Sequence, residues 1–209
     1  MTRNPLIDLG NIPIQSGTLH SVFERWASPQ EKVLRLERDG QLIRLKRGLY
    51  VVSSEVSGRD VDLRLCANHI YGPSYVSLQW ALCCYGMIPE RVMMMTSVTT
   101  KHSRTFENAL GTFYYRQVPH SYFPIGIREV EHDGIVCLMA SPEKALCDTI
   151  IAAAYIPSQS VSALREYLED DLRLDMDALR TLDIGIIEQC ANEGLKTLTL
   201  RNLIKIIEQ

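Results

Sequence analysis

One segment, residues 28–52, contains the strongest helix and turn signals, and these restrict what the chain can fold into. Ser28-Pro29-Gln30-Glu31 is typical of a helix N-terminus, because serine suits the N-cap, proline suits the first helical position and glutamate completes a capping box. Gly40 suits the residue that follows a helix C-terminus. Leu42–Val52 alternates and is rich in strand-forming residues, with Gly48 at the turn. The segment therefore predicts a helix that ends just before Gly40, followed by a β-hairpin.

The preceding segment predicts another short helix. From Thr18 onward, four apolar residues follow one another at the spacing of a single helix stripe. They are Leu19, Val22, Phe23 and Trp26. Residues 1–17 contain two prolines and two glycines, and this punctuation argues against a helix there. The order helix, break, helix, hairpin is that of a small winged helix-turn-helix whose usual front helix is missing or very short.

Positive charge is concentrated in the same part of the chain. The whole chain has a formal net charge of −3. Residues 1–50 carry 8 Lys and Arg against 5 Asp and Glu, whereas residues 51–209 carry 14 against 20. Such asymmetry is typical of a protein with one end that faces nucleic acid and another end with a different task.

Six cations in this region are the predicted DNA contacts. A winged helix presents its second helix to the major groove and its wing to the phosphate backbone. The predicted DNA-binding residues are Lys32, Arg35 and Arg38 on the helix, and Arg44, Lys46 and Arg47 on the hairpin. The alternative is a solvated charged face, because Glu37 and Asp39 lie on the same helix and would repel phosphate.

The rest of the chain predicts a larger α+β domain with a helical C-terminus. The polar segment 53–59 marks the predicted boundary between a first domain, 1–53, and a second domain, 54–209. The expected helices cover 61–70, the stretch from Ser74 or Ser77 to about Gly86, and 142 to about 155, and the expected strands cover 92–100, 111–118 and 134–139. After this core, which ends at about 155, a helical tail, 156–209, is expected to hold helices over 160–169, 176–191 and 198–208. Strands flanked by helices without strict βαβ alternation indicate the α+β class.

Metal and cofactor chemistry are not indicated. The six cysteines form no CxxC pair and the five histidines form no ligand pair, so no zinc site is expected. The cysteines are interpreted as small buried side chains in a reducing cytosol. No glycine-rich phosphate loop occurs, and no cofactor is predicted. No apolar run is long enough to cross a bilayer and no signal peptide is evident, so a cytoplasmic protein is expected.

One motif suggests catalysis. Ser141-Pro142-Glu143-Lys144 has the bare SxxK spacing of some serine acyl enzymes, in which a neutral lysine one helical turn away takes the serine proton. However, Pro142 at the first helical position makes Ser141 an N-cap candidate, and the companion motifs Ser-Asp-Asn and Lys-Thr-Gly do not follow. We therefore predict no catalytic residue, with a hydrolase that uses Ser141 and Lys144 as an alternative.

Two neighbouring stretches of the second domain have the composition of binding surfaces. Met93, Met94 and Met95 would face alternate sides of a strand, so packing on both sides of a sheet is the expected role. Residues 96–104 are polar and end in a cation-bearing loop, which would be able to meet a nucleic acid or a partner.

Four segments, taken in order, resemble the AbiEi family. They are Leu42–Tyr50, Tyr71–Ile88, Thr96–Thr105 and Ala140–Asp148. AbiEi proteins are the antitoxin and transcriptional-regulator components of type IV toxin–antitoxin systems, which are tied to abortive phage infection. The similarity covers roughly residues 18–155.

The resemblance implies a winged-helix domain that binds operator DNA and represses its own operon. It also implies a C-terminal antitoxin domain that antagonises a nucleotidyltransferase-like toxin encoded beside it, without a need for direct contact. The DNA contacts would fall on the same six cations, and residues 73–77 and 141–148 would be structural. Two copies are expected on an inverted repeat. The alternative is a protein-interaction module whose vestigial winged helix binds a protein partner instead of DNA.

Overall fold

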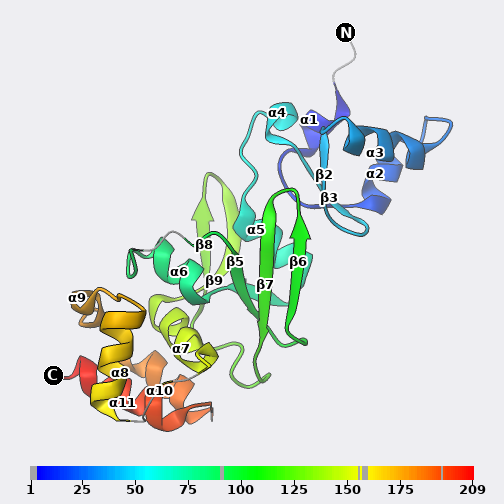
Figure 1. The fold of residues 1–209 in the computed structure, drawn as a ribbon. Helices are drawn as coiled ribbons and strands as arrows, with labels where there is room; N and C mark the ends of the chain where they lie inside the picture. Colours follow the sequence, from blue (N-terminus) through cyan, green and yellow to red (C-terminus); the bar gives the residue numbers. More distant parts are fainter. Residues whose placement is uncertain (1–3, 90–91, 155, 157–159, 194) are drawn as a thin grey trace.

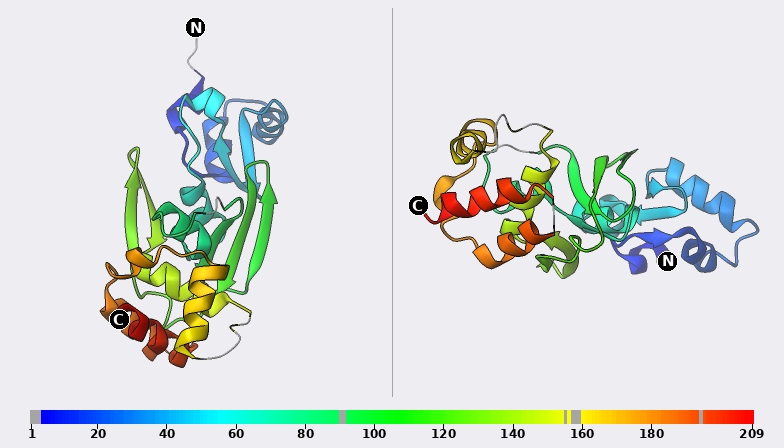
Figure 2. Two further views of the ribbon diagram at one scale, coloured as in Figure 1. Left: turned by 60° about the vertical axis from the view of Figure 1, so that its left-hand side comes forward. Right: turned by 90° about the horizontal axis from the view of Figure 1, so that it is seen from below.

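The computed structural model describes residues 4–89, 92–154, 156, 160–193 and 195–209. Figure 1 shows three parts along the molecule: helices with a small sheet at the N-terminal end, a larger twisted sheet in the middle, and a group of helices at the end that holds the C-terminus. The views in Figure 2 show the same order, with the first part and the last helices at opposite ends. Helices combined with a mixed sheet make this the α+β class that the sequence predicts.

The first part consists of α1 (Pro5–Leu9), β1 (Ile14–Gln15), α2 (Ser16–Val22), α3 (Pro29–Arg38), β2 (Leu42–Lys46) and β3 (Leu49–Val52). Its strands form an antiparallel sheet in the order β1-β3-β2. The helices and the sheet enclose one core of buried side chains: Leu6, Ile14, Leu19, Phe23, Val33, Leu36, Leu42, Tyr50 and Val52. Because α2, α3 and the hairpin share this core, it fixes α3 relative to the hairpin.

The signals at both ends of α3 act as the sequence predicts. Ser28 Oγ accepts a hydrogen bond from the main-chain N–H of Glu31 at 3.4 Å, and Pro29 is in the first turn. Gly40 follows the helix with a φ of 71°, a left-handed conformation that favours glycine. Gly48 has a φ of 79° at the hairpin turn. The predicted helix and hairpin are confirmed at these positions.

Two predictions for the start of the chain are wrong. α1 forms where no helix was expected, because Asn4 Oδ1 accepts a hydrogen bond from the N–H of Leu6 at 3.1 Å and Pro5 occupies the first turn. Gly10 ends this helix with a φ of 66°, so the proline and the glycine bracket a short helix instead of preventing one. α2 begins earlier than expected and stops short of Trp26, whose side chain is 48% exposed.

A six-stranded sheet forms the middle of the molecule from β4 (Ser74–Val76), β5 (Met95–Thr99), β6 (Arg104–Asn108), β7 (Gly111–Gln117), β8 (Ile127–His132) and β9 (Ile135–Ala140). The strand order is β6-β7-β5-β4-β9-β8, with parallel pairs β5–β7 and β4–β9 and antiparallel pairs elsewhere. The short α4 (Ser54–Ser57) connects the two parts, and α5 (Leu63–Ile70), α6 (Leu78–Cys84) and α7 (Pro142–Ala152) pack against the strands.

Several boundaries in this part differ from the sequence predictions. Of the two helix starts that the sequence offers, Ser77 is confirmed as the N-cap of α6, whereas Ser74 opens β4, a strand that was not predicted. The edge strands β6 and β8 were not predicted, because most of their side chains are exposed and give no apolar alternation. The expected packing of all three methionines is wrong: β5 starts at Met95, which leaves Met93 84% exposed and Met94 39% exposed.

The C-terminal part contains α8 (Val161–Glu166), a π-helical turn (Tyr167–Asp171), α9 (Met176–Leu179), α10 (Ile184–Asn192) and α11 (Thr197–Ile207). The single helix expected over 176–191 is therefore two helices, because Asp183 caps a new one by accepting a hydrogen bond from the N–H of Gly185 at 2.8 Å. α10 packs against α7, and α11 packs against α8 and α10. In the described part of the chain, no helix has the length and apolar character needed to cross a membrane.

The β2–β3 hairpin lies between two cores. Its side chains divide between them: Leu42, Tyr50 and Val52 pack in the first core, and Leu45, Leu49 and Val51 pack in the core of the larger sheet. The Asn108 amide at the end of β6 also donates a hydrogen bond to the main-chain oxygen of Leu45 at 3.1 Å. An irregularity between Arg44 and Lys46 breaks the strict alternation that the sequence predicts for β2. The hairpin is therefore part of the joint between the two parts.

Candidate nucleic-acid interface

The three cations predicted on α3 lie together around one hollow. This hollow has a volume of ≈ 460 Å³ and is lined by Trp26, Ala27, Ser28, Glu31, Lys32, Leu34, Arg35 and Arg38. The Lys32 ammonium lies 4.3 Å from the centroid of the Trp26 ring, and the Arg35 guanidinium carbon lies 6.0 Å from it. The exposed indole therefore holds two of the cations on its face, an arrangement favoured by the ring quadrupole.

Of the two acids that would oppose phosphate, Glu37 is paired within the protein, whereas Asp39 at the end of α3 is exposed. Arg44 on β2 donates a hydrogen bond to Glu37 Oε2 at 2.6 Å, and its guanidinium carbon lies 5.6 Å from the Tyr50 ring centroid. The hydrogen bond to Glu37 raises the pKa of Arg44, against the opposing effect of burial. The pair joins α3 to β2, so Arg44 has a protein partner of its own.

The hairpin's other two cations have different environments. Lys46 is half-buried, and its ammonium donates a hydrogen bond to the main-chain oxygen of Ile70 at 2.6 Å. Burial lowers the pKa of Lys46, and the charges of Lys101 and Arg104 lower it further. Arg47, at the turn, is exposed. The six predicted cations thus divide into a cluster of three on α3, two that bind other parts of the protein, and one at the hairpin turn.

The second part adds two cations beside the hairpin that were not among the predicted site residues. Lys101 and Arg104 line the same hollow as Lys46 and Arg47. The polar composition of residues 96–104 marks this stretch as cation-bearing, but its position beside the wing depends on contacts between residues far apart in the sequence. Local patterns carry no information about such contacts.

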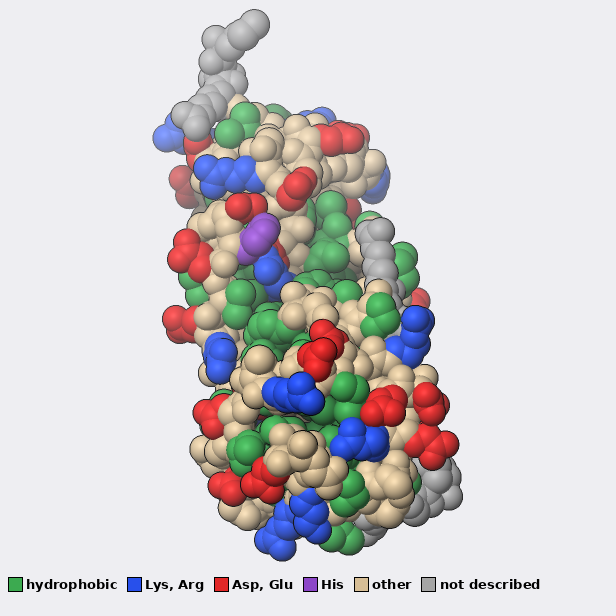
Figure 3. Space-filling model, turned by 90° about the vertical axis from the view of Figure 1, so that its left-hand side faces the viewer, with side chains coloured by type: hydrophobic (Ala, Val, Ile, Leu, Met, Phe, Trp, Pro, Cys, Tyr) green, Lys and Arg blue, Asp and Glu red, His purple; other side chains and the backbone are tan. Residues whose placement is uncertain are grey.

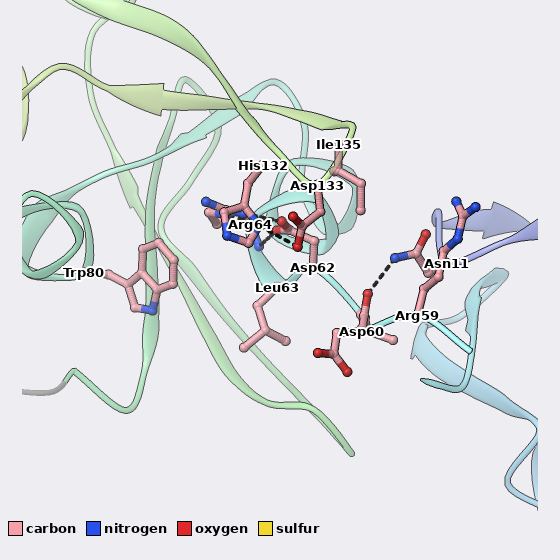
Figure 4. A pocket seen from close by; sticks show the side chains of 11 residues that line it. Asn11, Arg59, Asp60, Asp62, Leu63, Arg64, Trp80, His132, Asp133 and Ile135 are labelled. Atoms are coloured by element: carbon pink, nitrogen blue, oxygen red, sulfur yellow. Dashed lines mark hydrogen bonds and ion pairs between the residues drawn. The ribbon is translucent and has the colours of Figure 1, made fainter. Parts of the chain in front are cut away.

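Another hollow, with a volume of ≈ 570 Å³, lies at the joint between the two parts (Figure 4). It is lined by Asn11, Arg59, Asp60, Val61, Asp62, Leu63, Arg64, Trp80, His132, Asp133 and Ile135. Asn11 donates a hydrogen bond to the main-chain oxygen of Asp60 at 2.5 Å, which ties the first part to the connecting segment.

On the face of the molecule shown in Figure 3, acidic and basic side chains are interspersed, and neither positive nor negative charge forms a continuous patch.

An ion pair in this joint caps a helix. Asp62 accepts hydrogen bonds from the main-chain N–H groups of Arg64 and Leu65 at the start of α5, and its carboxylate pairs with the Arg64 guanidinium at 2.5 Å. Burial opposes the charge of Asp62, but the hydrogen bonds from Arg64 and Leu65 outweigh burial and lower the pKa of the carboxyl. The pair is thus a structural element of the joint.

The SxxK segment lies in the core. Ser141 Oγ caps α7 by accepting a hydrogen bond from the main-chain N–H of Lys144 at 3.3 Å, as its N-cap interpretation predicts. The Lys144 ammonium donates to the main-chain oxygen of Tyr122 at 2.9 Å and lies 3.5 Å from Asp148 Oδ1. Ser141, Lys144 and Asp148 are all buried. This geometry gives no support to the hydrolase alternative.

Asp148 is the centre of a buried polar network. Its carboxylate accepts hydrogen bonds from the hydroxyls of Ser77 at 2.6 Å, Tyr122 at 2.7 Å and Tyr75 at 3.1 Å. Burial raises the pKa of Asp148, while Lys144 and the three hydroxyls oppose the shift. The network connects β4 and the start of α6 to α7, and it involves residues from two of the segments that carry the family resemblance.

The cysteines occupy varied positions. All six are free thiols: Cys66, Cys137, Cys147 and Cys190 are buried, Cys83 is half-buried and Cys84 is exposed. The interpretation of the cysteines as buried side chains therefore holds for four of them and is wrong for Cys84. Among the described residues, no group of three His, Cys, Asp or Glu side chains is placed to hold a metal ion.

No model of a known protein family matches the chain, and a search of curated proteins finds no relative. Of the predicted DNA contacts, Arg35, Arg38, Arg44 and Arg47 are exposed, and Arg44 forms an ion pair with Glu37.

Proposed function

We propose that the protein is a DNA-binding transcriptional regulator whose first domain, residues 1–53, is a winged helix. The observation that carries the proposal is the element order α1-β1-α2-α3-β2-β3 combined with the sheet order β1-β3-β2. In winged helices, the second helix of the helix-turn-helix reads the major groove and the turn between the last two strands forms the wing. In this proposal, α3 is the recognition helix and the β2–β3 turn is the wing.

The cations divide between two roles. Lys32, Arg35 and Arg38 surround the hollow beside Trp26 and meet the DNA from the recognition helix, where arginine is able to contact guanine through two hydrogen bonds. Arg47 meets the phosphate backbone from the wing. Arg44 has a partner in Glu37 and Lys46 has one in Ile70, so we assign these two to holding the wing in place.

The second domain, 54–209, is proposed to carry antitoxin activity in the cytoplasm, against a nucleotidyltransferase-like toxin. This part of the proposal rests on the resemblance to the AbiEi family. It is supported by the bonding of Tyr75 and Ser77 to Asp148, which gives the similar segments a shared structural role. Repression of its own operon would then link the two domains in one regulator.

The direct test is binding of the full chain to the DNA upstream of its own operon, at two salt concentrations and against scrambled DNA. We expect selective binding that weakens as salt rises. Arg35→Gln should reduce the preference for the operator, whereas Arg201→Gln, an equal charge change at an exposed position on α11, should not. Absent or unselective binding by the unaltered protein would refute the repressor function.

A protein-interaction module with a vestigial winged helix is the second candidate. It is favoured by the internal partners of Arg44 and Lys46 and by the exposure of Trp26 and Leu34, which are 48% and 38% exposed between the α3 cations. Co-purification of the protein with the neighbouring toxin, in the absence of operator binding, would support this candidate.

A further inference from the structure

A groove with a volume of ≈ 520 Å³ lies between the wing and the edge of the large sheet. It is lined by Leu45, Lys46, Arg47, Tyr71, Lys101, Arg104, Phe106 and Glu107. Arg47 comes from the hairpin turn, Lys101 from the turn after β5, and Arg104 from the first position of β6. Cations from two domains therefore meet in one groove.

The positive charge of this groove is not neutralised by the protein. Arg47, Lys101 and Arg104 are exposed, and no ion pair joins them to an acidic side chain in the described parts of the chain. Glu107 lies on the wall of the groove but pairs with none of the three. Burial is the main cause of the lowered pKa of Lys46, and the neighbouring positive charges of Lys101 and Arg104 lower it further. Such a concentration of positive charge attracts a polyanion.

The cations of the groove also have contacts within the protein. The Lys101 ammonium donates one hydrogen bond, to the main-chain oxygen of Gly72 at 2.5 Å. Unlike the half-buried Lys46, Lys101 is exposed, and an ammonium has three donors, so two of them remain for a phosphate. The Lys101 ammonium lies 5.3 Å from the centroid of the Tyr71 ring, and the Arg104 guanidinium carbon lies 4.8 Å from that of Phe106. The two rings also pack against each other, with centroids 5.4 Å apart. Because the cations cover these rings, the rings are poorly placed to stack on unpaired bases, which is how single-stranded nucleic acid is bound. The arrangement suits phosphate oxygens instead.

We infer that this groove is a phosphate-binding part of the DNA interface, in which the duplex backbone that meets Arg47 on the wing continues onto Lys101 and Arg104 of the second domain. This inference rests on the proposed function. Contacts of this kind position a protein on DNA and supply affinity without selecting a sequence. The second domain would thus take a direct part in holding the operator.

The main test compares two double variants of the full chain. Lys101→Gln/Arg104→Gln removes the two cations, and Arg201→Gln/Lys205→Gln removes the same charge from exposed positions on α11. For the groove variant, we expect the slope of log affinity against log salt to become shallower by about 1.8, which is about 0.9 for each lost contact. Affinity should fall at least about tenfold on operator and scrambled DNA alike, and the control should match the unaltered protein.

A second measurement needs no substitution in the groove. The unaltered protein is treated with an acetylating reagent, with and without operator DNA, and the modification of each lysine is read by mass spectrometry. We expect DNA to protect Lys101 but not Lys205. This readout remains decisive if the groove variant does not fold, because it uses the native chain.

The outcomes separate this inference from the proposed function. If the unaltered protein binds its operator and Arg35→Gln weakens selectivity, but the groove variant matches the α11 control and Lys101 is not protected, the groove inference is wrong and the repressor function stands. If the unaltered protein does not bind DNA, both the groove inference and the repressor function are wrong. A shallower salt slope together with protection of Lys101 supports both.

Discussion

Asp148 accepts a 2.6 Å hydrogen bond from the hydroxyl of Ser77, 71 residues earlier in the chain. Two tyrosine hydroxyls and the Lys144 ammonium complete the surroundings of this carboxylate. A buried carboxylate of this kind is stable only while all its hydrogen-bond and ion-pair partners are present. Removing one partner leaves a buried polar or charged group unsatisfied. The stability of the larger sheet and its helices should therefore depend strongly on this one residue.

Asp148→Asn should destabilise the protein by about 3–5 kcal/mol, because it leaves the Lys144 ammonium buried without its counter-charge. Urea-induced unfolding followed by circular dichroism measures the change. Asp177→Asn, at an exposed carboxylate on α9, is the matched control and should stay within about 0.5 kcal/mol of the unaltered protein. Equal unfolding midpoints for the two variants would show that the network contributes little.

Replacing both members of the buried pair by apolar residues should be less harmful than replacing one. Lys144→Met/Asp148→Leu removes both charges together, so no unpaired charge remains in the core. We expect a midpoint above that of Asp148→Asn, although the hydroxyls of Ser77, Tyr75 and Tyr122 lose their acceptor. A double variant less stable than Asp148→Asn would contradict this account.

The stability contributed by Asp62 should depend on pH. Its carboxyl has a lowered pKa in the folded protein, so the folded state favours the charged form more than the unfolded chain does. The contribution is present above the unfolded pKa of about 4 and is lost as pH falls through the lower folded value. Asp62→Ala should cost about 1–2 kcal/mol at neutral pH, and the difference from the unaltered protein should shrink below about pH 4. A difference that stays constant down to the acid limit of folding would refute the assignment.

Glu37→Gln should strengthen DNA binding. The change removes an acid from α3 and releases Arg44, which is then free to reach a phosphate. The hairpin keeps its other ties, from Lys46 to Ile70 and from Asn108 to Leu45, so the wing stays in place. We expect the slope of log affinity against log salt to become steeper by up to about 0.9, the value for one added phosphate contact. The affinity itself should rise several-fold. Glu188→Gln, at an exposed position on α10, makes the same charge change far along the chain and should leave affinity unaltered. Identical affinities for the two variants would show that Arg44 and Glu37 lie away from the DNA.

Arg47 and Lys46 should behave differently although they are adjacent. Arg47→Gln should make the salt slope shallower by about 0.9 and leave stability within about 0.5 kcal/mol. Lys46→Gln should leave the slope nearly unaltered but reduce stability by about 1 kcal/mol, because the hydrogen bond to Ile70 is lost. Salt titrations and urea unfolding of both variants test this pair, and the reverse pattern would contradict the roles given to the two residues.

Local signals account for what the sequence predicted well. The cap at Ser28, the glycine at position 40 and the turn at Gly48 each act within a few residues, so α3 and the hairpin follow directly from them. α1 was missed because Pro5 and Gly10 argue against a helix when they are considered alone, although with the Asn4 cap they begin and end a short one. The edge strands β6 and β8 were missed because an exposed edge gives no apolar alternation.

The candidate site was only partly predictable, for a physical reason. The grouping of Lys32, Arg35 and Arg38 follows from helical periodicity, which spacing alone reveals. The internal partners of Arg44 and Lys46 depend on how β2 packs on α3 and on the second domain, and no local pattern encodes that packing. The winged helix, the DNA contacts and the antitoxin activity stay predictions that the binding experiments decide.

The side chains of the β2–β3 hairpin pack into two cores, and this has a consequence for regulation. If DNA binds this hairpin as proposed, and if a ligand tightens the part of the chain after residue 53, both act on the same two strands. A coupling free energy between two binding events is reciprocal, so each ligand must change the affinity for the other by the same factor. If both proposed activities hold, repression and toxin antagonism are linked equilibria, and the occupancy of the operator reports the state of the antitoxin domain.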